Sequence, residues 1–170
     1  MTRLMTGESS LTIRDAKPAD ITLIYSLVRE LADYERLSDE VSATAGDIAT
    51  ALFAPQPRLF CDLAEWDGKA AGFAMWFLNF SSFRGRHGIY LEDIFVRPPF
   101  RAKGIGKALM RGLARRCLAQ GYARFEWAVL DWNATAIDFY RNIGANVLDD
   151  WRICRLSGDA LAQFAGRGAH

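Results

Sequence analysis

The stretch that decides the fold is Arg101–Ala108, RAKGIGKA, in which two glycines and three basic residues stand together. It follows YLEDIFVRPPF (90–100), a run rich in β-branched and aromatic residues that predicts a strand. It precedes LMRGLARRCLA (109–119), whose apolar spacing predicts a helix. Glycines at the N-terminus of a helix allow an anion to approach the free backbone N–H groups of the first turn. The stretch therefore predicts a helix N-terminus that binds an anion.

Two well-known phosphate-binding patterns do not fit this stretch. The P-loop pattern, GxxxxGK[ST], fails because Ala108 follows Gly106-Lys107 and because no glycine lies five residues before Gly106. The dinucleotide-binding pattern, GxGxxG, fails because Leu109 occupies the place of its third glycine. The anion is therefore not held in either of these two ways.

A pyrophosphate such as that of coenzyme A fits the stretch better. Successive N–H groups around Gly104 and Gly106 point into one concavity, and the helix adds the positive end of its dipole. Arg101, Lys103 and Lys107 add charge-assisted hydrogen bonds. The pattern RxxGxG is short, and by itself it is equally compatible with a plain loop that begins a helix.

The composition limits the class of protein. The chain has 170 residues, of which 51% are hydrophobic and 24% charged, which is typical of one globular domain with a buried core. Its 21 basic and 20 acidic residues leave a formal net charge of +1, so we expect neither a nucleic-acid-binding nor a membrane protein. Three cysteines without a CxxC pair and two histidines offer no metal-ligand spacing. We expect no metal, no disulfide framework and a cytoplasmic location.

The spacing of apolar residues predicts a single α/β domain over residues 11–165, with a mostly antiparallel mixed sheet. Residues 1–10 are predicted to be a flexible N-terminal tail. Asp67-Gly68, between two strand-like runs, is a strong hairpin signal. The predicted strands are 11–14, 59–66, 70–80, 88–96, 123–130 and 147–156, and the predicted helices are 18–35, 44–53, 104–121, 133–143 and a short one after Ser157.

A second motif makes the anion site more specific. About thirty residues after RxxGxG, the block Trp132–Ala145 contains NxxAxxFYxxxGA. With both motifs in this order, the chain resembles the GNAT superfamily of N-acetyltransferases over about residues 11–161. ELADYE (30–35), GFAMWF (72–77) and YLEDIFV (90–96) are most similar to its diamine (spermidine/spermine) and thialysine acetyltransferase branch. The resemblance implies the GNAT-type acyl-CoA N-acyltransferase fold, in which helices flank a mixed, mostly antiparallel sheet.

The resemblance implies that acetyl-CoA is the co-substrate. In this family the pantetheine arm adds to the sheet like an extra strand, through backbone groups that correspond to Ile94–Val96, although these residues are also plain core strand. Asn133 can cap its helix as well as bind the coenzyme. The coenzyme-binding residues implied are Ile94, Phe95, Val96, Arg101, Ala102, Lys103, Gly104, Ile105, Gly106, Lys107, Asn133, Ala136 and Tyr140.

Two residues match the family's catalytic positions. An alkylamine of pKa about 10.4 is protonated at pH 7, and removing its proton costs roughly 4.6 kcal/mol. Glu92 matches the strand glutamate that accepts this proton, directly or through water. Tyr140 matches the general acid that protonates the leaving thiolate. The alternatives are an acidic pair with Asp93 on a solvated strand edge and an ordinary half-buried helix tyrosine.

The acceptor site is predicted to be acidic. The residues that match or neighbour substrate-binding positions of the branch are Tyr34, Glu35, Glu92, Asp93 and Glu126. Their carboxylates favour a small cationic amine, either a polyamine or a thialysine-like amino acid, although Glu35 and Glu126 are equally compatible with plain surface charge. A peptide or protein N-acetyltransferase and a non-catalytic acyl-CoA sensor are the alternative functions. The resemblance and the apolar segment 147–156 together predict a homodimer.

Overall fold

The computed structural model describes residues 2–6 and 9–166, which form two compact units, Met1–Ala128 and Val129–His170. The first unit contains a six-stranded sheet in the order β1-β2-β3-β4-β5-β6. Neighbouring strands are antiparallel except β5 and β6, which are parallel. The strands are β1 (Thr2–Thr6), β2 (Ser9–Asp15), β3 (Phe60–Trp66), β4 (Lys69–Ser81), β5 (Arg86–Val96) and β6 (Phe125–Trp127).

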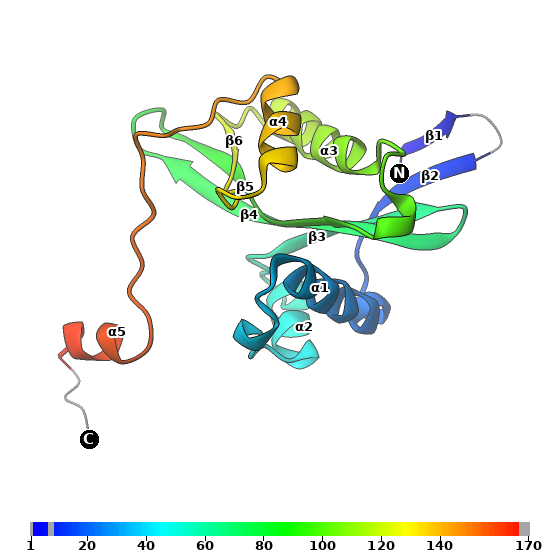
Figure 1. Cartoon of the computed structure of the whole chain (residues 1–170). Helices are drawn as coiled ribbons and strands as arrows, with labels where there is room; N and C mark the ends of the chain where they lie inside the picture. Colours follow the sequence, from blue (N-terminus) through cyan, green and yellow to red (C-terminus); the bar gives the residue numbers. More distant parts are fainter. Residues whose placement is uncertain (1, 7–8, 167–170) are drawn as a thin grey trace. The chain divides into compact units, whose positions relative to one another are not determined.

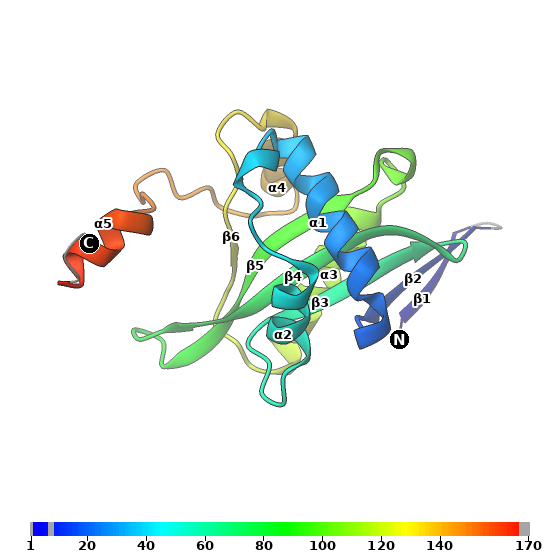
Figure 2. The same ribbon diagram turned by 90° about the horizontal axis from the view of Figure 1, so that it is seen from below.

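Helices cover both faces of this sheet. The helices of the first unit are α1 (Ile21–Glu35), α2 (Ala45–Phe53) and α3 (Ile105–Ala119), with 3₁₀ turns at Pro18–Asp20, Ser38–Glu40 and Pro98–Phe100. Helices α1 and α2 lie on one face and α3 on the other (Figure 1). Figure 2 views the sheet from the side that α1 and α2 cover. The predicted α/β fold with a mostly antiparallel mixed sheet is confirmed.

Local sequence signals explain two of these elements. Asp67 and Gly68 both have positive φ, 50° and 74°, as a two-residue hairpin between β3 and β4 requires. Thr44 and Asp47 form a reciprocal capping box at the start of α2, where the Thr44 Oγ1 accepts from the Asp47 N–H at 3.2 Å. The predicted hairpin and the predicted α2 are therefore confirmed.

The main core lies between the sheet and helices α1 and α2. Its buried members from the helices are Ile24, Leu27, Leu31, Ile48 and Leu52, and those from the strands are Cys61, Leu63, Phe73, Met75 and Phe95. The opposite face of the sheet is covered by α3, whose Leu109 and Leu113 are completely buried. Because successive strand residues alternate between the two faces, β3 and β4 carry buried residues on both of them.

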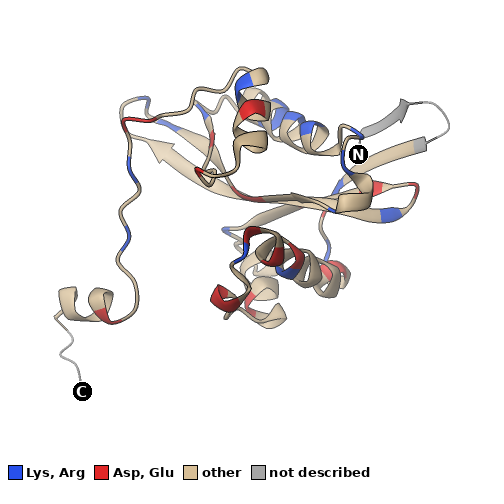
Figure 3. Ribbon diagram, in the orientation of Figure 1, with Lys and Arg blue, Asp and Glu red and all other residues tan. Residues whose placement is uncertain are grey.

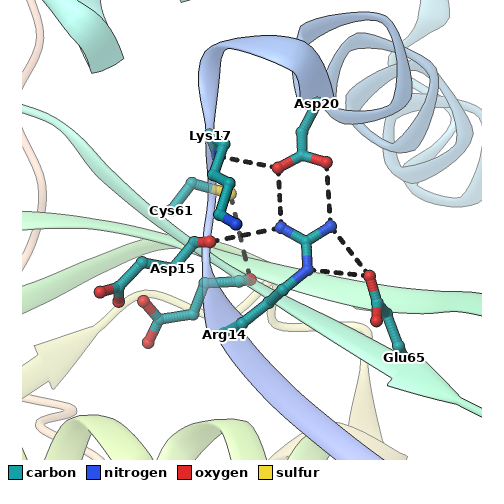
Figure 4. A network of polar contacts seen from close by, with 7 residues as sticks. Arg14, Asp15, Lys17, Asp20, Cys61 and Glu65 are labelled. Atoms are coloured by element: carbon teal, nitrogen blue, oxygen red, sulfur yellow. Dashed lines mark hydrogen bonds and ion pairs between the residues drawn. The ribbon is translucent and has the colours of Figure 1, made fainter. Parts of the chain in front are cut away.

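An arginine on β2 ties this strand to its surroundings. The Arg14 guanidinium donates to both carboxylate oxygens of Asp20, at 2.7 and 2.9 Å, and to Glu65 Oε1 at 2.9 Å (Figure 4). The hydrogen bond from Arg14 holds the pKa of Asp20 below its usual value. The network thus bridges the turn that leads from β2 into α1, which begins at the residue after Asp20.

The second unit contains α4 (Ala134–Asn142) and α5 (Gly158–Phe164). The Asn133 side chain accepts from the Ala136 N–H at 3.2 Å, so Asn133 caps α4 as predicted. The helix ends at the predicted place, and Gly144 has a positive φ of 91° just beyond it.

Three expectations from the sequence are wrong. The predicted tail 1–10 contains strand residues: Thr2–Thr6 form β1, which pairs with β2, and Ser9–Ser10 begin β2. Residues 1, 7 and 8 of the predicted tail lie outside the described part. The predicted strand 147–156 is irregular and pairs with none of the described strands. The strand predicted over 123–130 is confined to Phe125–Trp127. The homodimer stays a prediction, without the strand that had supported it.

Two further features concern only the described residues. None of their helices combines the length and the apolar character that a bilayer crossing requires. In the same residues, no group of three or more His, Cys, Asp and Glu side chains is arranged to hold a metal ion.

Candidate active site

Strand β5 carries a bulge at Glu92. On β4, Met75 pairs with Asp93 and its neighbour Trp76 pairs with Leu91, so Glu92 is the extra residue. Asp93 projects to the face covered by α1 and α2, because its cross-strand partner Met75 belongs to that core. The bulge removes the strict alternation that would have sent Glu92 and Asp93 to opposite faces. The two carboxylates interact, since the Glu92 charge contributes to a raised pKa of Asp93.

The same strand has an open edge directly after the bulge. Strand β6 pairs with β5 only over Ile89–Leu91. Within residues 2–6 and 9–166, no strand pairs with that side of β5 from Glu92 to Val96. Its backbone N–H and C=O groups are available to an extended ligand that adds to the sheet. This is the geometry that a pantetheine arm requires, and Ile94–Val96 are the residues for which it was predicted.

The RxxGxG stretch forms the predicted helix N-terminus. Gly104 is the N-cap of α3 with a positive φ of 76°, and no side chain caps the helix. The first N–H groups of α3 therefore lack an intrahelical partner. A Cβ built on Gly106 meets only Val96 Cγ2, at 3.8 Å. The protein itself does not need a glycine at this position, so the absence of a side chain leaves room for a ligand.

Basic side chains surround this N-terminus. Ala102 has a positive φ of 61°, which is strained for alanine and turns the chain between the basic residues. Lys103 Nζ lies 5.1 Å from the centre of the Trp66 ring, and Lys107 is exposed in the first turn. Figure 3 shows Lys and Arg residues gathered along α3. The free N–H groups and these cations together fit a pyrophosphate.

Arg101 links the coenzyme residues to the end of α1. Its Nε donates to the Val96 carbonyl at 2.9 Å, and its guanidinium lies 4.6 Å from the centre of the Tyr34 ring. The Tyr34 ring also contacts that of Phe95, with the centroids 6.4 Å apart. Tyr34, predicted to bind the acceptor, therefore lies beside the strand that was predicted to bind the coenzyme.

Three predicted carboxylates come together on the α1 side of the bulge. Burial first, and then the charges of Glu92 and Glu35, together raise the pKa of Asp93 to about 6. Burial also raises the pKa of Glu35, at the last residue of α1. Such a cluster of negative charge is stabilised by a bound cation, so it suits an amine.

Glu126 lies near this cluster but is already paired. Its Oε2 accepts from Asn79 Nδ2 at 2.7 Å and forms an ion pair with Arg124 Nε at 2.8 Å. In the parallel ladder Glu126 stands beside Tyr90, whose pKa is raised by burial and then by the charges of Glu92 and Glu126. Arg124 already balances the charge of Glu126. Glu126 therefore attracts a bound cation less strongly than Asp93 or Glu35 does.

Sequence reasoning missed two residues of this region. The charges of Glu92 and Glu126 both act on Tyr90, and its position two residues before Glu92 on the same strand could have pointed to it. Arg97 makes a two-fold ion pair with Glu30, at 2.6 and 2.9 Å, which connects the end of β5 to α1. No local pattern pointed to Arg97, because the two residues are far apart in the sequence.

The remaining predicted residues belong to the second unit. Tyr140 is on α4 and is 8% exposed, and it takes part in interactions with its surroundings. Asn133 and Ala136 share the cap of the same helix. Their roles in coenzyme binding and catalysis stay predictions.

The raised pKa of Asp93 predicts a pH-dependent change in stability. In the folded protein this carboxyl has a pKa of about 6, above its ordinary value of 3.8. Because its pKa is higher in the folded state, Asp93 holds its proton more tightly there than in the unfolded state. Ionisation of Asp93 as the pH rises therefore lowers the free energy of unfolding, by at most about 3 kcal/mol. We expect Asp93→Asn to raise the free energy of unfolding relative to the original chain above pH 6 and to lose this advantage below about pH 4.

Chemical denaturation at several pH values measures this difference. The matched control is Asp39→Asn, which removes a carboxylate from an exposed position. Only the difference between variant and original chain is informative, because burial also raises the pKa of Asp62 to about 6. An Asp93→Asn effect that is the same at pH 4 and pH 8 would contradict the buried, charge-coupled environment described here.

Comparisons with known proteins agree with this geometry. The family model for the acetyltransferase (GNAT) family matches residues 22–145. A thialysine N-epsilon-acetyltransferase from Sus scrofa is 35% identical over 170 residues, covering 94% of this chain and 99% of that protein. An L-ornithine N5-acetyltransferase from Arabidopsis thaliana is 33% identical over 194 residues, covering 88% of this chain and 85% of that protein.

A solved structure supports the fold. An integron cassette protein from the mobile metagenome of V. cholerae superposes with a TM-score of 0.76 at 27% identity, covering 91% of this chain and 97% of that one. The resemblance to the GNAT superfamily that the two sequence motifs indicated is confirmed, including its thialysine acetyltransferase branch. The chain belongs to the acetyltransferase (GNAT) family and is an acyltransferase.

Proposed function

We propose that this enzyme transfers the acetyl group of acetyl-CoA to a primary amine of a small cationic acceptor, either a polyamine or a thialysine-like amino acid. The observation that carries the proposal is the position of the acidic cluster. Glu35, Glu92 and Asp93 interact beside the open edge of β5. The N-terminus of α3, which suits an anion, follows the same strand. One side of β5 thus favours a cation, while the segment after it favours a phosphate.

The residues present fit the coenzyme. Acetyl-CoA supplies the acyl group as a reactive thioester. The backbone of Ile94–Val96 would bind the pantetheine arm, and the segment from Arg101 to Lys107 would bind the pyrophosphate. Arg101 now donates to the Val96 carbonyl, whose second lone pair is free for another donor. The coenzyme-binding roles predicted for Asn133, Ala136 and Tyr140 belong to the same proposal.

The acidic cluster has two tasks in this proposal. Asp93 and Glu35, with Tyr34 beside them, bind the cationic acceptor and hold it near the bulge. Glu92, at the bulge, accepts the proton that the amine must lose before its nitrogen can attack the thioester. Tyr140 donates a proton to the departing thiolate. Glu126, whose charge Arg124 balances, has a minor part in binding the acceptor.

The relatives support an amine acceptor of this kind. One is named for the acetylation of thialysine and another for that of ornithine, and both of these compounds are small amino acids with a side-chain amine. They share most of their length with this chain.

The experiment that tests the acceptor class is an assay of thiol release from acetyl-CoA across a panel of amines. We expect turnover with small diamines, polyamines or ω-amino acids, and a kcat/KM at least tenfold lower with lysine-containing peptides, because the interacting carboxylates favour a compact cation. A preference for peptides would favour the protein N-acetyltransferase. Tight acetyl-CoA binding without turnover on any acceptor would favour the acyl-CoA sensor.

A further inference from the structure

An apolar groove of about 410 Å³ lies on the sheet face covered by α2. Thr50, Ala51 and Ala54 of α2 line it together with Leu59 and Phe77 of the sheet side. Two polar residues, Gln56 and Arg58, complete the lining. We call this surface the Arg58 groove.

Arg58 is the only basic residue that lines the groove. It is exposed, and it makes no ion pair with any residue among 2–6 and 9–166. Other arginines near the sheet are paired, for example Arg14 with Asp20 and Arg97 with Glu30. The guanidinium of Arg58 is therefore available to an anion from outside the chain.

A pair of aromatic rings relates the Arg58 groove to the carboxylates at the bulge. Phe77 pairs with Tyr90 across β4 and β5, and their rings are 5.1 Å apart. Tyr90 in turn lies close enough to Glu92 and Glu126 for their charges to raise its pKa. A ligand that follows the two rings passes from the carboxylates around the bulge to the groove.

The distance between Asp93 and Arg58 suits a short acceptor. Asp93 pairs with Met75, Met75 pairs with Cys61, and Arg58 lies three residues before Cys61. With about 4.8 Å between strands and 3.3 Å per residue along them, the Cα atoms of Asp93 and Arg58 are on the order of 14 Å apart. A linear acceptor whose two charged ends are several carbon–carbon bonds apart is long enough for a span of this order.

We propose that the Arg58 groove is a second part of the acceptor site, in which Arg58 binds a carboxylate at the end of the acceptor remote from the reacting amine. The proposal rests on the proposed acetyl transfer and specifies its acceptor as a linear ω-amino acid. A guanidinium and a carboxylate form paired, charge-assisted hydrogen bonds. A polyamine would place a cation beside Arg58, where like charges repel, so the groove selects against it.

The test compares two acceptors that differ by one carboxylate, ornithine and 1,4-diaminobutane. We expect Arg58→Gln to raise the KM for ornithine about tenfold and to leave that for 1,4-diaminobutane unchanged or lower. Arg58→Lys should restore part of the ornithine preference, because it keeps the positive charge without the planar fork. The matched control is Arg84→Gln, at an exposed arginine in the turn between β4 and β5, which should change neither value.

Calorimetric titration with each compound separates this proposal from the function on which it rests. Ornithine that binds more tightly than 1,4-diaminobutane in the original chain, but not in Arg58→Gln, supports the carboxylate site even if no acetyl group is transferred. Turnover of neither compound would then count against the proposed function alone. The Arg58 proposal is overturned if Arg58→Gln weakens both compounds equally, or if it changes the binding of neither.

Discussion

Replacing Tyr140 by phenylalanine is expected to lower kcat/KM by about 10²-fold or more at every pH. The hydroxyl is the proposed donor of a proton to the departing thiolate, and phenylalanine keeps the ring but removes this proton. Raising the pH does not restore activity, because the missing group has no connection with the ionisation of the amine. Tyr122→Phe is the matched control, since it removes a hydroxyl from a half-buried tyrosine outside the predicted site.

Glu92→Gln gives the contrasting profile. If Glu92 accepts the amine proton, the loss is largest at low pH, where nearly all of the amine is protonated, and high pH partly restores activity by supplying neutral amine. The pH dependence of kcat/KM for the two variants separates the two roles. Parallel profiles, or a Tyr140→Phe enzyme with full activity, would remove the support for these assignments.

The second large effect is expected at Gly106. A valine there places a branched side chain at the N-terminus of α3, where the pyrophosphate would approach the backbone N–H groups. We expect acetyl-CoA affinity to fall by about 10²-fold, since more than one charge-assisted hydrogen bond is lost. The folded protein should tolerate the change, because a Cβ on Gly106 contacts only Val96 Cγ2 at 3.8 Å.

Gly112→Val is the control for this experiment. Gly112 lies in the same helix, and a Cβ on it meets no atom within 4 Å. Both variants replace glycine by valine in the same helix and so share the same change in helix propensity, which means that a difference in calorimetric acetyl-CoA affinity reports on the ligand site. Equal affinities in folded Gly106→Val and Gly112→Val would show that the N-terminus of α3 does not bind the pyrophosphate.

Much of the fold was predictable because its signals are local. The hairpin at Asp67-Gly68 needs only two residues that accept positive φ, and the capping box of Thr44 and Asp47 is read within four residues. The failures depend on distant partners. Strand β1 forms by pairing with β2, and the segment 147–156 pairs with no described strand although its composition is suitable for one. Strand propensity alone cannot supply a partner.

The candidate site likewise combines a part that a local motif predicted with parts that depend on contacts between distant residues. The motif predicted the glycine N-terminus of α3, whereas the arrangement of Glu92 and Asp93 depends on a register shift against Met75 and Trp76. That shift arises from pairing between two strands and has no signal in either one. The contact of Arg101 with Tyr34 joins residues from separate elements, so it too became visible only in three dimensions.

The most direct test of the central claim is to measure both products of one reaction. Purified enzyme is incubated with acetyl-CoA and ornithine or a diamine, and free thiol and N-acetylated amine are quantified together, the latter by mass spectrometry. The account predicts equal amounts of the two products, and it predicts that neither forms in the absence of an amine. Thiol released without acetylated amine, or no acetylated product from any small cationic amine, would contradict it.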